Sequence, residues 1–187
     1  MNTRLIVAVL VGTAVLTSAC GSADDTPLTD AQGQWVDAFC NGVLPGMEAG
    51  FELRKQDAAN PAAVKTAYLK LVTANATAFG AAEKKLTELG APEDGLKSVH
   101  ERLVKFVQQS AKSYQDAQAP VEKLEPNGQF WDEAEKILAE KNQVSSPEDL
   151  RATFQDLQKR PKYADALNKS APCVEIKSKG QDLLTNQ

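Results

Sequence analysis

Apolar side chains recur every three or four residues along two long stretches of this chain, and this periodicity limits the possible folds more than any other feature. The first stretch is Val64, Tyr68, Leu71, Asn75, Ala78, Ala82, Leu86 and Leu89. The second is Leu96, Val99, Leu103, Phe106, Ser110, Tyr114 and Ala117. Such spacing predicts amphipathic helices. Because a short connection containing Gly90 and Pro92 separates them, we expect these helices to pack antiparallel, as in up-and-down bundles.

Further helices are expected on both sides of this pair. Residues 29–32 fit a capping box, and an apolar stripe through Trp35 and Phe39 follows. Pro45 is expected to kink or end that first helix, leaving a second helical piece, because proline lacks an amide hydrogen and clashes with the preceding turn. Shorter stripes run from Phe130 to the end of the chain. With no convincing strand pattern, residues 29–187 are predicted to form one all-α domain, an up-and-down bundle of four to six helices.

Asn75 is a polar residue on an otherwise apolar stripe. A buried amide at such a position can define the register of two helices when it pairs with another polar group on the facing stripe. Ser110 is the partner that we expect, since it interrupts the second stripe in the same way.

The first twenty residues have the layout of an export signal. Arg4 precedes the apolar run Leu5–Leu16, and the small residues 17–19 stand before Cys20. The run is about twelve residues long, which is too short to span a bilayer. Two cleavage routes fit this pattern, an ordinary signal peptidase and the lipoprotein pathway.

Residues 16–20, Leu-Thr-Ser-Ala-Cys, resemble the lipobox of bacterial lipoproteins. The resemblance implies removal of residues 1–19 and attachment of a diacylglyceryl group to the sulfur of Cys20. Two acyl chains would hold the protein stably at the membrane. Residues 20–28 are small, polar and acidic, so we expect a flexible tether that keeps a helical domain close to the extracytoplasmic side of the cell membrane.

Once Cys20 is assigned to lipid, two of the three cysteines remain, Cys40 and Cys173. In an oxidising compartment we expect them to form a disulfide that links the first helix to the C-terminal segment. The alternative is a free, reactive thiol at either position. The sequence Trp35 to Cys40, the distant Cys173 and the alanine-rich middle also resemble small actinobacterial envelope lipoproteins, a likeness that supports the disulfide and implies no activity.

Catalytic and cofactor motifs are scarce in the sequence. His100 is the single histidine, without a Cys or His one helical turn away, so no metal site is expected. The glycines form no phosphate-binding loop, and the net charge of -4 argues against nucleic acid as a partner. Trp35, Phe130 and Trp131 are the candidate ligand-binding residues, although aromatic rings on helical stripes usually belong to the core. We expect no cofactor and no enzymatic activity.

Two functions fit these observations. In the first, the protein is a non-enzymatic envelope lipoprotein that binds a surface protein or a wall component. In the second, the bundle is a carrier that opens a cavity for a lipid or another hydrophobic ligand near Pro45 and Pro120. A packed core without a cavity of ligand size would argue against the carrier.

Overall fold

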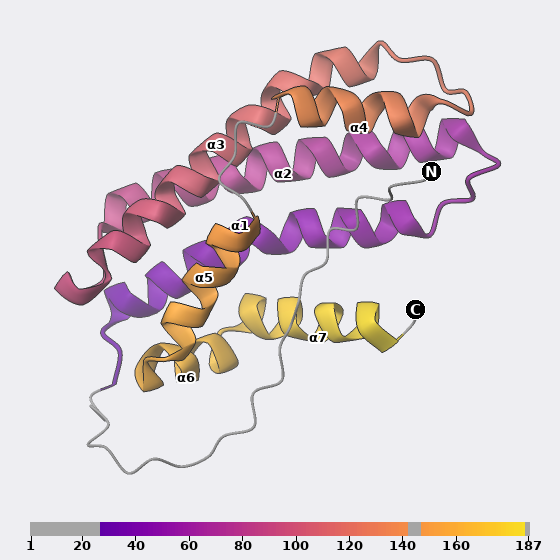
Figure 1. Ribbon diagram of the computed structural model, residues 1–187. Helices are drawn as coiled ribbons and strands as arrows, with labels where there is room; N and C mark the ends of the chain where they lie inside the picture. Colours follow the sequence, from indigo (N-terminus) through magenta and orange to yellow (C-terminus); the bar gives the residue numbers. More distant parts are fainter. Residues whose placement is uncertain (1–26, 142–146, 186–187) are drawn as a thin grey trace.

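The computed structural model describes residues 27–141 and 147–185, which contain seven α-helices and no strand (Figure 1). The helices are α1 (Asp30–Arg54), α2 (Pro61–Leu89), α3 (Lys97–Glu122), α4 (Phe130–Lys141), α5 (Pro147–Gln158), α6 (Pro161–Lys169) and α7 (Ala171–Thr185), with a 3-10 turn at Asp94–Leu96. The all-α class is therefore confirmed. The described part has one helix more than the upper expectation of six, because extended backbone at Ser170 divides the last segment into α6 and α7.

Local sequence signals set the ends of the long helices, and the predicted capping box of α1 is confirmed. Thr29 and Gln32 form the capping box of α1, with the Gln32 amide donating to Thr29 Oγ1 at 3.3 Å and the Thr29 amide donating to Gln32 Oε1 at 2.9 Å. Asn60 caps α2 by accepting the Ala63 amide at 3.2 Å. Gly90, with a φ of 68°, follows the last residue of α2.

Pro45 lies inside α1 and does not end it, so of the two expected outcomes, a kink or an end, the structure contradicts the end. The helix continues through Pro45 to Arg54 and buries Gly46 and Leu53. Packing along α2 explains the continuity, since a proline costs only one hydrogen bond and a local clash whereas the second half of α1 gains a buried face. Pro120 likewise lies within α3, in its last turn.

Helices α1, α2 and α3 are the long elements of the bundle and run alternately up and down (Figure 1). We call the end at which α1 begins the proximal end; there Gln32 Nε2 donates to the Pro92 carbonyl at 3.1 Å. The opposite, distal end holds the α1–α2 connection and the α3–α4 connection. At this end the start of α2 is tied to the end of α3. Lys65 Nζ of α2 donates to the carbonyl of Glu122, the last residue of α3, at 2.8 Å.

The shorter helices cover different sides of this framework. Helix α4 packs on α3 and α2 near the distal end, α5 packs on α3, and α6 and α7 pack on α1 (Figure 1). Two clusters of buried side chains result. The proximal core includes Trp35, Phe39, Leu86, Leu103, Leu157 and Tyr163, and the distal core includes Leu53, Tyr68, Val72, Val121, Phe130 and Ala134.

Asn75 is buried as expected, but its amide has a different partner. Asn75 Nδ2 donates to the Leu71 carbonyl of its own helix at 3.0 Å, not to Ser110. The side chain fills the space beside Gly46 of α1. Its role is therefore to set the close approach of α1 and α2.

Candidate functional site

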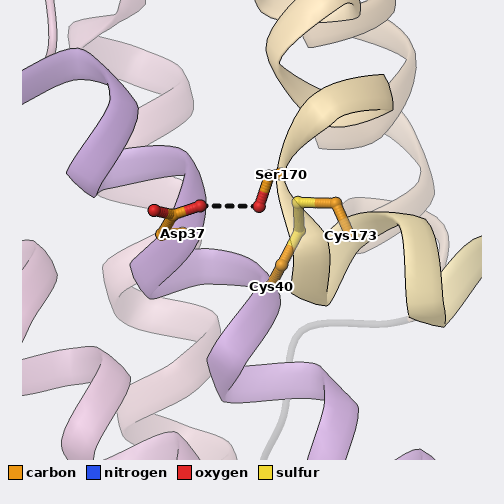
Figure 2. Close-up of a disulfide and its surroundings, with 4 residues drawn as sticks. All are labelled: Asp37, Cys40, Ser170 and Cys173. Atoms are coloured by element: carbon orange, nitrogen blue, oxygen red, sulfur yellow. Dashed lines mark hydrogen bonds between the residues drawn. A yellow bond between two sulfur atoms is a disulfide. The ribbon is translucent and has the colours of Figure 1, made fainter. Parts of the chain in front are cut away.

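A disulfide joins Cys40 of α1 to Cys173 of α7, as predicted (Figure 2). The sulfur atoms are 2.03 Å apart and the Cα atoms 5.1 Å apart. Both cysteines are buried. Ser170 Oγ donates to Asp37 Oδ1 at 2.6 Å beside the bridge, so α7 is attached to α1 by a covalent bond and a neighbouring hydrogen bond.

Trp35, one of the three candidate ligand-binding residues, lies in the proximal core and is fully buried. Its indole Nε1 donates to Nδ1 of His100 at 3.0 Å. This bond requires an unprotonated Nδ1, and burial lowers the pKa of His100 below its ordinary value. The single histidine is thus engaged in packing α3 against α1. No group of three potential metal ligands occurs among the side chains that the structure describes.

The other two candidates, Phe130 and Trp131, open α4 and have opposite environments. Phe130 is 1% exposed in the distal core, whereas Trp131 is 45% exposed. Successive residues on a helix point about 100° apart, so the face of α4 that packs on α2 and α3 buries only one ring fully. Of the three candidates, only Trp131 is available to a partner.

Tyr68 of α2 packs against Trp131 of α4. The Tyr68 ring meets the Trp131 ring edge to face, with centroids 5.8 Å apart. Its hydroxyl donates to Glu135 Oε1 at 3.0 Å. Burial, followed by the nearby Glu135 carboxylate, raises the pKa of Tyr68, so the hydroxyl stays protonated and keeps donating. Since Glu135 lies one helical turn after Trp131, Tyr68 orients an aromatic ring and a carboxylate on one face of α4.

Carboxylates flank Trp131 along the chain. Residues 122–135, which we call the acidic tip, comprise the end of α3, the connection and the first half of α4, and contain one lysine and five carboxylates: Glu122, Glu125, Asp132, Glu133 and Glu135. Three of these carboxylates, at 122, 125 and 132, are exposed and two are half-buried. The ion pairs within the described part of the chain involve none of the five.

The proximal end has the opposite electrostatic character. There Glu93 receives both Arg160, at 2.7 Å, and Lys162, at 2.5 Å. Arg160 also donates to the Gly95 carbonyl at 2.7 Å. Cations neutralise the carboxylate at this end, while the carboxylates of the acidic tip lack such partners.

A separate hollow of about 500 Å³ lies at the distal end between α1 and α2. Its lining is Ala49, Glu52, Gln56, Asn60, Ala62, Ala63, Thr66, Ala67 and Lys70. Most of these side chains are short, and Glu52 and Lys70 at its edges are exposed. It is an open surface groove and contains none of the candidate aromatic residues.

No protein-family model, no curated protein and no solved structure matches this chain. The lipidation candidate, Cys20, lies outside the described residues. Among the helices that the structure describes, none has the length and hydropathy needed to cross a membrane.

Sequence reasoning named Trp131 but missed the acidic tip around it. The spacing of Trp131 and Glu135 and the excess of carboxylates in residues 122–135 were visible signals. Tyr68, 63 residues before Trp131 in the chain, had no local signal of its role, because its contact with α4 depends on tertiary packing.

Proposed function

We propose that the protein is a lipid-anchored envelope protein that acts by binding another surface component rather than by catalysis. The observation that carries this proposal is the pairing of Cys40 with Cys173. A stable disulfide is typical of exported proteins. The pairing also leaves Cys20 as the third cysteine of the sequence, directly after the small residues of a lipobox-like segment.

The position of the exposed aromatic residue supports a role in binding. Attachment through Cys20 would place the proximal end toward the membrane, because α1 begins there. The 25 residues of α1 rise about 37 Å, so Trp131 at the distal end would face away from the bilayer. The single histidine, which is the commonest acid–base residue in enzymes, is instead hydrogen-bonded to buried Trp35.

The carrier is the second candidate, and the groove between α1 and α2 is the feature that bears on it. Its volume is within the range of ligand pockets. Ligand pockets, however, usually bury most of the ligand surface, and an open groove lined by four alanines and five polar or charged side chains provides little enclosure. Trp35 and Phe130 fill the cores, and α1 and α3 continue through Pro45 and Pro120, so the features that favoured an internal cavity are used in packing.

The proposed function has a direct test in the native cell. The protein is crosslinked in intact cells, and the membrane fraction is compared between wild type and Cys20→Ser. We expect the wild type to remain with the membrane and to give a reproducible crosslinked neighbour, while the variant is released. Membrane retention of Cys20→Ser, or the absence of any reproducible neighbour, would contradict the proposal.

A further inference from the structure

We propose that the acidic tip binds a basic segment of a partner protein, with an arginine or lysine head group placed over Trp131. This inference rests on the proposed function, since it names the chemistry of the partner that the lipoprotein would bind. It concerns a surface at the end of the bundle farthest from the expected anchor. Its support comes from charge, from helix geometry and from the exposed ring.

The charge argument begins with the carboxylates at the end of α3. Asp132 and Glu133 lie in the first turn of α4, where the helix dipole stabilises negative charge, so local structure accounts for them. Glu122 is the last residue of α3 and Glu125 follows three residues later, beyond the end at which the dipole favours cations. The last turn of α3 contains no basic residue, and the one lysine of the tip, Lys123, is the C-cap residue that follows it. A cation supplied by a partner would reduce the repulsion between these carboxylates and the negative end of the α3 dipole.

Within the chain itself, a lysine reaches the carbonyls at the end of α3 but does not pair with the nearby carboxylates. Lys65 reaches the end of α3, but its ammonium group donates to the backbone carbonyls of Glu122 and Leu124 rather than to a carboxylate. The Glu122 side chain accepts a bond from the neutral Gln118 amide at 3.1 Å. The carboxylates of the tip therefore keep their capacity to pair with incoming cations.

Trp131 adds a second type of attraction for the same kind of group. A cation above an indole ring is attracted by the negative face of the ring, and arginine can also stack on it. Trp131 is one of two large hydrophobic side chains that are exposed among the described residues, the other being Val174 on α7. Glu135, held by Tyr68, lies one turn along the same helix and can pair with the cation. An acidic polymer would be repelled by the same surface.

Binding of length-matched peptides tests this inference. The full chain, purified in detergent, is presented with immobilised peptides rich in arginine, in glutamate or in neutral residues, and with a neutral oligosaccharide. We expect selective binding of the arginine-rich peptides, with an affinity that falls as salt is added. Trp131→Ala should weaken that binding about tenfold.

Two further variants separate binding from folding. Glu122→Gln combined with Glu125→Gln changes only exposed side chains, and it should weaken binding several-fold and reduce its dependence on salt. Val174→Ala removes the other exposed apolar side chain, at a distance from the tip, and should leave peptide binding unchanged. The circular dichroism spectrum of each variant shows whether its helices are intact.

Three results would overturn the inference: equal binding of all peptide classes, unchanged binding by Trp131→Ala and by the double glutamine variant, or preferential binding of the oligosaccharide. These results do not affect the proposed function. If wild-type protein still gives a reproducible neighbour in cells and Cys20→Ser is released, a lipid-anchored binding protein stands and only the basic partner is excluded.

Discussion

Gly46→Ala offers the sharpest test of how α1 and α2 pack. A Cβ at position 46 would lie 1.9 Å from Asn75 Oδ1 and 2.6 Å from Asn75 Cγ. Non-bonded heavy atoms prefer separations near ~3.5 Å, so the amide group or a whole helix must move by more than about 1 Å. Asn75 is 6% exposed and bonded to the Leu71 carbonyl, so a displaced amide loses that bond in a buried place.

The expected magnitude follows from three contributions. Overpacking a well-packed core costs about 1–3 kcal/mol. A buried amide left without its hydrogen bond costs about 1–3 kcal/mol. The higher helix propensity of alanine offsets about 1 kcal/mol. We therefore expect Gly46→Ala to lower the free energy of unfolding by about 1–5 kcal/mol.

Urea unfolding followed by circular dichroism measures this loss, with Gly80→Ala as the matched control. Gly80 lies inside α2, and a Cβ there would meet nothing within 4 Å, so that variant should be up to about 1 kcal/mol more stable than wild type. Shortening the opposing side chain in Gly46→Ala/Asn75→Ala should recover part of the loss. A Gly46→Ala protein as stable as wild type would refute the reasoning about this contact.

Three other predictions concern the bridge, the histidine and the anchor. Replacing Cys40 and Cys173 together with alanine should lower the free energy of unfolding by about 2–5 kcal/mol, measured by urea titration, and non-reducing mass analysis of wild type should show the two cysteines linked. Because burial lowers the folded-state pKa of His100 below the unfolded value of about 6.5, its contribution to stability should be complete above that pH and decline as the pH falls through the folded-state pKa. Urea midpoints across this range, compared with those of His100→Gln, measure the effect, and identical profiles would contradict it. Mass analysis of the mature N-terminus should find a diacylglyceryl group on Cys20, and an unmodified Cys20 would argue for plain secretion.

Several features of the fold were predictable because they depend on neighbouring residues. The stripes through Val64–Leu89 and Leu96–Ala117 place apolar side chains on one helical face whatever the fold, so they predicted the α2–α3 pair. The capping box at Thr29 depends only on residues within one turn, and it formed as expected. The disulfide could be predicted once Cys20 was assigned elsewhere.

Pro45 shows where local rules fail. Taken alone, proline disfavours a helix interior, but α1 continues because its second half buries residues against α2. Asn75 is a similar case: its burial followed from periodicity, yet its neighbour across the helix pair is Gly46 rather than Ser110. Periodicity predicts which face is buried, while the residue that meets it depends on the rotation and offset of the packed helices.

For the candidate site too, some features follow from the sequence alone and others only from the packing of the helices. By itself, the sequence determined that Phe130 and Trp131 point in different directions and that carboxylates are concentrated in residues 122–135, because both follow from the order of residues along the chain. Only the tertiary structure decided that Phe130 is the buried ring, that Tyr68 supports Trp131 and Glu135, and that the cations pair elsewhere. The physical reason is that burial and ion pairing depend on distances between side chains far apart in sequence, which packing of α4 on α2 and α3 establishes.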